Sequence, residues 1–274
     1  MKYLLIISVT ILISLLQGCS LIKIGIAYGQ STENFIVHPK DSRVLYETGA
    51  EASADTIVSH IENSIAIVES MHYQKFSKDI KIHVCASIET FESHTTMKKS
   101  RGTTIGDKLF LSPKLFTQPK TVKSILTHEL SHLHLAQKLG GITLYMNVPS
   151  WFQEGLATYV SSGGGAEKIS VYDAVKALES QTFFIPDDTA SIFDLKNATS
   201  YGFTEHYSDP LTAQHMYYRQ SSMFVAYLKN SDNDSFNGLM KLILKGEKFK
   251  SAYSKKFDGN IKDSWNKFVG MTAT

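Results

Sequence analysis

Cysteine is nearly absent from this chain, which has only Cys19 and Cys85 among its 274 residues. A framework of several disulfides, such as holds small secreted domains together, is therefore excluded. Cys85 lies in Ile80–Ala86, a run whose alternation is typical of a half-buried strand. We interpret Cys85 as a small buried apolar residue rather than as a nucleophile.

An excess of charge of either sign is also missing, because 28 Lys and Arg side chains stand against 26 Asp and Glu. The chain therefore lacks the basic footprint of a nucleic-acid-binding protein, and we predict no nucleic-acid partner. Internal repeats and low-complexity tracts are absent as well. The composition is ordinary for a globular protein of one domain, or of two lobes that share a cleft.

A hydrophobic run long enough to span a bilayer is the third absence, since Leu4–Leu16 covers only thirteen residues and a span takes about 20. With Lys2 before it, the run is typical of a secretory signal peptide. Its ending, Leu16-Gln17-Gly18-Cys19, resembles the lipobox of bacterial lipoproteins. The resemblance implies cleavage after residue 18 and a lipid on Cys19. An ordinary signal peptide with an incidental Cys19 is the alternative.

The lipobox implies a membrane partner, reached through the lipid on Cys19, and a place in the bacterial cell envelope. Ser20 follows the cysteine, where an aspartate would signal retention at the inner membrane. We therefore expect the outer membrane, with the protein facing the periplasm.

The motif His128–His132 reads H-E-L-S-H and lies within Thr121–Lys138, whose apolar residues recur at helical spacing. Residues four apart on a helix differ by about 40° in direction and about 6 Å in height, so both imidazoles point the same way. This is the arrangement with which a helix binds one Zn2+ through two histidines. Glu129 is then placed as a general base, and His134 lies off the ligand face. A surface helix with two solvated histidines is the alternative.

A catalytic zinc site needs a third protein ligand, for which Glu154 is the candidate. Ser150 and Gln153 have the spacing of a capping box that starts a second helix, and Gly163–Gly165 is predicted to end it. Glu154 falls in the first turn of this apolar segment, where an unpaired carboxylate is costly. Because it follows His132 by 22 residues, the two helices can pack side by side and share a metal. Alternatively, Glu154 only favours the positive end of its helix.

The stretches H-E-L-S-H and P-S-W-F-Q-E-G-L-A together resemble the gluzincin metallopeptidases, in particular the small bacterial peptidase MA-like domains with HExxH followed by WxxEGxA. The resemblance covers residues 124–160 and, more weakly, 214–228. It implies a zincin-like fold, Zn2+ bound by His128, His132 and Glu154, and hydrolysis of peptide bonds. Thr158 stands where relatives often carry an acidic residue, so we expect the metal to be held less firmly here.

A donor that stabilises the oxyanion of the reaction is predicted in the helix 214–228. Tyr217 belongs to the apolar stripe of this helix, whereas Tyr218 lies off the stripe and is freer to face a cleft. The segment Tyr-x-Gln-Ser also resembles the tyrosine-bearing segment of the family. We favour Tyr218 over Tyr217, with packing as the alternative for either, and His215 as a second donor to be weighed.

The order of predicted elements indicates an α+β fold in which a small mixed sheet lobe precedes a mainly helical C-terminal lobe, with the active site between them. A helix at 55–75, a strand at 80–86, a helix at 88–97 and a hairpin at 102–112 come before the metal helix. By the resemblance, Lys108–Ser112 is the edge strand that aligns extended substrates. After a connection through 145–148 come the second helix, a linker at 182–210 that borders the cleft, and two amphipathic helices from Asp234 on.

The chain therefore divides at the sequence level into four parts, which are a signal peptide at 1–18, a lipidated tether and extended segment at 19–48, an α/β lobe at 49–145 and a helical lobe at 146–274. The predicted function is that of a zinc-dependent peptidase acting on a peptide or protein. A non-catalytic zincin-like binding or assembly lipoprotein is the alternative, which loss of a ligand or of Glu129 would favour. The sequence leaves endopeptidase and exopeptidase action open.

Overall fold

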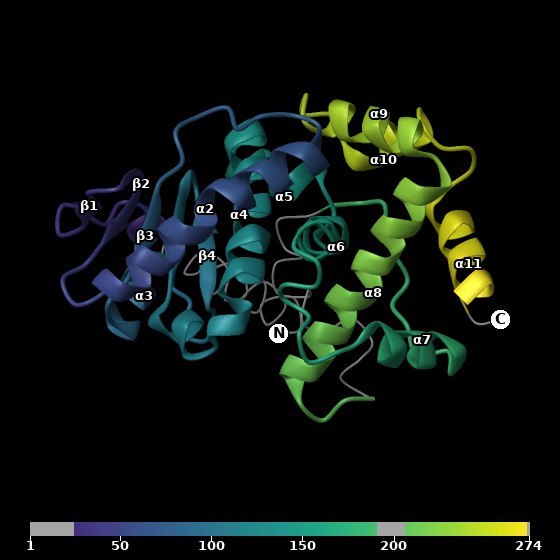
Figure 1. Ribbon diagram of the computed structural model, residues 1–274. Coiled ribbons are helices and arrows are strands. Elements are labelled where there is room, and N and C mark those ends of the chain that lie inside the picture. Colours follow the sequence, from purple (N-terminus) through teal and green to yellow (C-terminus); the bar gives the residue numbers. More distant parts are fainter. Residues whose placement is uncertain (1–24, 191–205, 273–274) are drawn as a thin grey trace, which may run out of the picture.

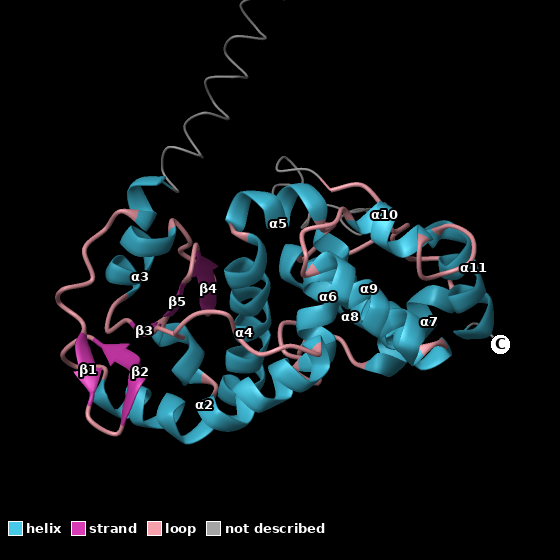
Figure 2. Ribbon diagram, turned by 90° about the horizontal axis from the view of Figure 1, so that it is seen from above, coloured by secondary structure: helices cyan, strands magenta, loops and turns pink. Residues whose placement is uncertain are grey.

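The computed structural model describes residues 25–190 and 206–272. The predicted signal peptide, Cys19 and the middle of the 182–210 linker lie outside these ranges. Within the described ranges the strands all precede Val122, and the elements from there on are helices, so the fold is α+β (Figures 1 and 2). Figure 2 shows the strands gathered on one side of the molecule and helices α6 to α11 on the other.

The sheet is mixed and has five short strands in the order β1-β2-β3-β5-β4. The outer pairs β1/β2 and β4/β5 are antiparallel, and the inner pairs β2/β3 and β3/β5 are parallel. The strands are β1 (Ile36–His38), β2 (Asp41–Tyr46), β3 (Ile82–Val84), β4 (Gly102–Ile105) and β5 (Lys108–Leu111).

Alternation along the strands gives the sheet two apolar faces. One face, with Val44, Ile82 and Leu109, joins the main core of the molecule. The other carries Cys85 and Phe110 in a smaller cluster. Cys85 is buried as predicted, and burial raises the pKa of its thiol, which disfavours the thiolate that a nucleophile needs.

Helices α2 (Glu51–His72) and α4 (Val122–Leu139) cover the main-core face of the sheet and pack against each other (Figure 1). Helix α4 also packs against α6 (Ser150–Val160), which in turn lies along α8 (Pro210–Ser231). The other α-helices are α3 (Ile88–Thr95), α5 (Gly141–Asn147), α7 (Val171–Glu179), α9 (Asn233–Ile243), α10 (Phe249–Ser254) and α11 (Ile261–Thr272), and two 3-10 helices, η1 (Pro113–Thr117) and η2 (Pro119–Thr121), precede α4. The helix α4 therefore stands between the sheet and the helical part.

The predicted edge strand is wrong. The strand β5 pairs with β3 on one side and with β4 on the other, so the edge belongs to β4, the first arm of the hairpin. The sequence predicts the hairpin correctly, but the choice of the outer arm depends on the long-range pairing of β5 with β3.

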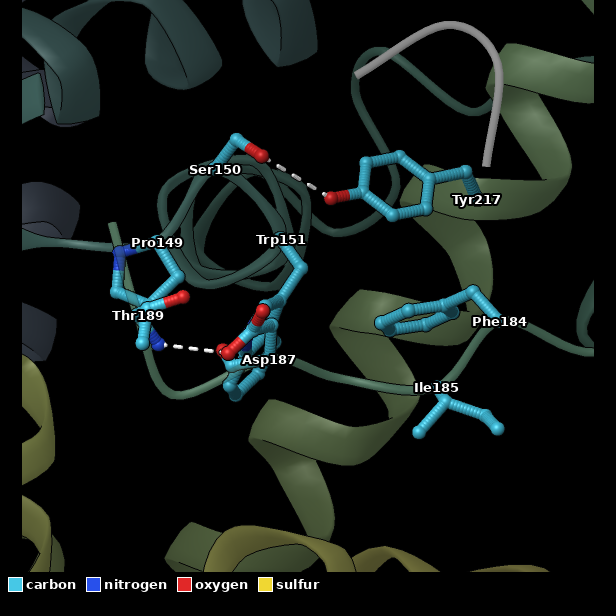
Figure 3. A pocket seen from close by; sticks show the side chains of 8 residues that line it. All are labelled: Pro149, Ser150, Trp151, Phe184, Ile185, Asp187, Thr189 and Tyr217. Atoms are coloured by element: carbon cyan, nitrogen blue, oxygen red, sulfur yellow. Dashed lines mark hydrogen bonds between the residues drawn. The ribbon is translucent and has the colours of Figure 1, made fainter. Parts of the chain in front are cut away.

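Two local predictions around α6 also need correction. The connection at 145–148 lies largely in helix α5, and no capping box starts α6. The hydroxyl of Ser150 lies 3.3 Å from the hydroxyl of Tyr217 instead (Figure 3), and Gln153 Nε2 donates to the carbonyl of Val148 at 2.7 Å. The Ser150 side chain therefore makes a tertiary contact and the Gln153 side chain bonds the preceding turn, so neither caps the helix.

Helix α7 and the short helix α10 were not predicted. Because of α10, residues 233–272 hold three helices rather than the two expected. Helix α7 does carry a local signal, since Ser170 and Asp173 form a capping box. Helix α10 has only six residues and buries Phe249 and Tyr253, so its helical spacing is too short to read from sequence.

The buried His83 predicts how stability changes with pH. Its ring packs against Phe35 and Phe110, with centroids 5.0 and 4.7 Å away, and burial lowers its pKa from 6.5 to about 4. The unfolded chain therefore binds the proton first, and stability falls as pH drops from 6.5 towards 4, by up to about 3 kcal/mol for this group. Denaturant unfolding at several pH values should show a smaller loss over this window for His83→Phe. Parallel pH profiles for the two proteins would contradict this account.

Candidate metal centre

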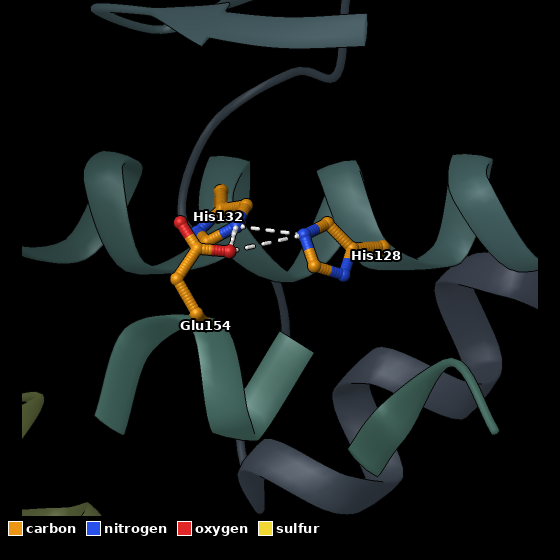
Figure 4. A group of neighbouring side chains, drawn as sticks. All are labelled: His128, His132 and Glu154. Atoms are coloured by element: carbon orange, nitrogen blue, oxygen red, sulfur yellow. Dashed lines mark hydrogen bonds and ion pairs between the residues drawn. The ribbon is translucent and has the colours of Figure 1, made fainter. Parts of the chain in front are cut away.

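Three predicted ligands meet at the contact between α4 and α6 (Figure 4). His128 and His132 project from successive turns of α4, and their Nε2 atoms lie 3.1 Å apart. Glu154, in the first part of α6, places Oε2 at 3.3 Å from His128 Nε2 and at 3.4 Å from His132 Nε2. The three atoms thus form a nearly equilateral triangle.

The size of this triangle fits a zinc ion. Tetrahedral zinc with bonds of about 2.0–2.1 Å separates its ligand atoms by roughly 3.3 Å. Although the Glu154 contacts are within ion-pair distance, Oε2 is buried without a hydrogen-bond donor, so its lone pairs are free for a cation. Two imidazoles and one carboxylate suit zinc or another transition metal rather than calcium or magnesium.

The turn after α6 fixes the orientation of His128. Its Nδ1 donates to the carbonyl of Gly164 at 2.9 Å, which leaves Nε2 as the atom with a lone pair. A Cβ on Gly165, whose φ is +85°, would lie 2.8 Å from His128 Cε1, and one on Gly164 would lie 2.5 Å from the carbonyl oxygen of Ser124. These glycines therefore allow the turn to pack closely against His128. They do not end α6, which already ends at Val160. Three glycines in a row exceed what a helix end needs, and that excess was the signal missed in the sequence.

Glu154 interacts electrostatically with both imidazoles. Burial alone would raise the pKa of Glu154, but the charges and contacts of His132 and His128 outweigh burial and hold it well below its usual range. Burial alone would lower the pKa of His132, yet the carboxylate of Glu154 raises it. Glu154 is consequently ionised at neutral pH, as a metal ligand has to be.

Glu129 lies beside the ligands and beneath the sheet edge. A Cβ on Gly102, the first residue of β4, would lie 2.9 Å from Glu129 Cγ, so the strand backbone touches this side chain directly. Burial raises the pKa of Glu129, with smaller opposing effects of the two histidines. A raised pKa brings a carboxylate closer to the range in which a general base works best.

Tyr218 and Tyr217 point to different environments, as predicted. Tyr217 is 2% exposed and belongs to the main core. The ring of Tyr218 stacks on His128 with centroids 6.0 Å apart, and its hydroxyl accepts a hydrogen bond from Gln214 Nε2 at 3.0 Å. Burial and the charge of Glu154 raise the pKa of Tyr218 well above its usual value, so the phenol keeps its proton and can donate it.

Tyr145 is a second phenol near the centre that sequence reasoning missed. It lies in α5, and its pKa is raised by burial and then by the charges of Glu154 and Glu129. The segment 145–148 was interpreted as a connection, so its side chains were not considered. The two glycines were interpreted only as the end of the preceding helix, whereas α5 begins at Gly141 itself.

The two other histidines that were weighed have structural partners. His134 Nε2 donates to the carbonyl of Gln74 at 3.0 Å, and its Nδ1 lies 3.0 Å from Nδ1 of the buried His72. His134 is therefore not a ligand, as predicted. His215 accepts at Nδ1 from the backbone N–H of Lys168 at 3.0 Å, and burial lowers its pKa to about 4, so it is neutral at pH 7.

Comparison of the chain with known proteins gives no matching family model and no matching curated protein. Nor does any helix in residues 25–190 and 206–272 combine the length and apolar character that a membrane span requires. The functional assignment therefore depends on the geometry of the centre.

The glycine turn predicts a specific loss of metal affinity. Gly165→Ala strains a positive φ and pushes a methyl group against His128, so we expect zinc affinity to fall about 10- to 100-fold. Gly246→Ala is the matched control, because Gly246 has a φ of +89° with nothing within 4 Å of the added carbon. Competition with a fluorescent chelator measures both affinities. Equal affinities in the two variants would show that the turn does not seat the ligand.

Proposed function

We propose that this chain is a zinc-dependent peptidase with a zincin-like arrangement of sheet, metal helix and helical lobe. The observation that carries the proposal is the convergence of His128 Nε2, His132 Nε2 and Glu154 Oε2, which lie 3.1 to 3.4 Å from one another. Glu129 lies on the same helix as the two histidines. Glutamate between two histidine ligands at this spacing is the pattern of metal-dependent peptide hydrolysis.

The roles of the protein groups follow from their positions. When bound, zinc would polarise the scissile carbonyl and acidify a water molecule. Glu129 accepts the proton of the attacking water and passes it to the amine that leaves, a role to which its raised pKa is suited. Tyr218, kept protonated by burial, donates a hydrogen bond to the oxyanion. Gly164 holds His128 in the tautomer that leaves Nε2 free.

The edge strand β4 supports a mode of substrate binding. One side of β4 pairs with β5, and its first residue, Gly102, rests on Glu129. An extended peptide that adds to the other side of β4 by backbone hydrogen bonds would pass the general base. Pairing of this kind reads side chains weakly, so it aligns the substrate without selecting it.

We also propose that a lipid on Cys19 anchors the protein to the cell envelope, most simply at the outer membrane facing the periplasm. The lipobox-like ending Leu16–Cys19 supports this. A tethered peptidase would meet substrates confined to the envelope.

Replacement of the general base tests the proposal directly. Glu129→Gln should keep the zinc and lower kcat for cleavage of an unstructured protein about 10²- to 10⁴-fold. A chelator should abolish the activity of the wild-type chain, and added zinc should restore it. Cleavage that persists at the wild-type rate in Glu129→Gln, or in chelator, would rule out this mechanism.

The two neighbouring tyrosines give a matched pair of variants. Tyr218→Phe should lower kcat about 10²-fold, because the ring can still stack on His128 while the hydroxyl that serves as oxyanion donor is lost. Zinc content measured in parallel separates this effect from loss of the contact between the Tyr218 hydroxyl and Glu154. Tyr217→Phe, which removes a hydroxyl that lies 3.3 Å from Ser150, should leave kcat near the wild-type value. If Tyr218→Phe is as active as Tyr217→Phe, Tyr218 is not the donor, and Tyr145→Phe is then the variant to measure.

A further inference from the structure

One ion pair joins the two lobes beside the metal centre. Arg101 Nη2 donates to Glu167 Oε2 at 2.8 Å, and the side chains are 22% and 23% exposed. Arg101 immediately precedes β4 in the sheet lobe, whereas Glu167 lies in the segment between α6 and α7. The pair thus sits between the edge strand and the helical lobe and remains within reach of solvent.

Both partners adjoin groups of the proposed reaction. Arg101 is bonded to Gly102, whose backbone rests on Glu129. On the other side, Glu167 Oε1 accepts from the backbone N–H of Gly165, the residue packed on His128. The ion pair is therefore connected through Gly102 to the general base and through Gly165 to one metal ligand, at the point where β4 begins.

The guanidinium is only partly used by this contact. Arginine offers five N–H donors in a planar fork that matches a carboxylate through two parallel hydrogen bonds. Among the described residues, Glu167 takes one side-chain hydrogen bond from Arg101, through Nη2. An incoming carboxylate that formed both parallel bonds would compete well with Glu167, at a site that is neither fully buried nor fully open.

We propose, on the basis of the peptidase function above, that Arg101 binds a carboxylate of the substrate close to the bond that is cut, and that Glu167 holds this place until substrate arrives. A peptide paired with β4 reaches Arg101 just before the first residue of the strand, Gly102, which lies next to Glu129. The substrates selected are therefore peptides with an acidic side chain or a free C-terminal carboxylate at that position. Arg101 is a specificity-determining residue and takes no part in proton transfer.

Two substitutions separate this role from a purely structural link between the lobes. Arg101→Gln removes the receptor, whereas Glu167→Gln removes only the competing charge, since the new amide oxygen can still accept from Gly165 N–H. A substrate receptor predicts opposite effects of the two variants on peptide affinity. A structural link predicts effects of the same sign, because either variant breaks the same ion pair.

The measurement uses the full chain, zinc-loaded and carrying Glu129→Gln, so that bound peptide is not cut. The probes are three fluorescein-labelled octapeptides of one apolar sequence, which end in a free carboxylate, in an amide, or in an amide with one internal aspartate. Fluorescence anisotropy gives each Kd, and zinc content is measured for every variant. Arg101→Lys is added as the conservative variant, which keeps the charge and loses the fork.

We expect Arg101→Gln to raise Kd at least about tenfold for a carboxylate-bearing peptide, Arg101→Lys to raise it less, and Glu167→Gln to lower it severalfold, with the plain amide peptide unaffected. The peptide that responds tells whether the carboxylate is terminal or on a side chain. Effects of equal sign, or equal effects on all three peptides, would overturn the proposal. Because binding is measured without cleavage, a receptor that is present in a chain without peptidase activity would overturn the proposed function alone.

Discussion

The rest of this structure depends on one constraint at the contact of α4 and α6. There, His128 Nε2, His132 Nε2 and Glu154 Oε2 lie within 3.4 Å of one another. One of these atoms, Glu154 Oε2, is a buried carboxylate oxygen with no aligned hydrogen-bond donor among the described residues, which is costly unless a cation compensates it. The backbone approaches that bring these atoms together need residues without a side chain. A Cβ on Gly155, the residue after Glu154, would lie 2.7 Å from the carbonyl oxygen of Ser221 in α8, and the turn around Gly165 closes on His128 in the same way. Glycine at these positions thus permits the convergence of His128, His132 and Glu154, and α8 packs closely behind the residue after Glu154.

Polar groups also fix the far side of the metal helix. His72 Nε2, on α2, lies 3.0 Å from the hydroxyl of Ser131, the residue just before His132 in the sequence. The other ring nitrogen of His72, Nδ1, lies 3.0 Å from Nδ1 of His134. Thr127 donates to Ser64 at 2.9 Å in the same interface. Because buried polar groups lose their partners when a helix rotates or slides, these contacts hold α4 in one rotation, with its ligands facing α6. The packing of α2 against the sheet is thereby coupled to the geometry of the candidate metal centre.

Periodicity and spacing were sufficient to predict the helix with His128 and His132, the hairpin and the helix with Glu154, because each is specified by local apolar patterning and by turn residues. They also placed Tyr217 in the core and Tyr218 outside it. The edge strand was wrong because the order β3-β5-β4 is set by pairing between segments far apart in sequence. The prediction of a capping box was wrong because Ser150 and Gln153 have other partners. The contact of His128 with Gly164, the position of Tyr145 and the ion pair of Arg101 with Glu167 depend on how separate elements pack, which no local pattern encodes.

The central claim is that His128, His132 and Glu154 hold a zinc ion, and metal analysis of the purified full chain by mass spectrometry tests it most directly. The account predicts about one zinc per chain, lost in His132→Ala and in Glu154→Ala and retained in His60→Ala, a control histidine on α2 away from the centre. Iron in place of zinc would keep the site and change the chemistry, since non-haem iron uses the same donor set. A folded chain without metal, or metal content that does not depend on His132 and Glu154, would contradict the account.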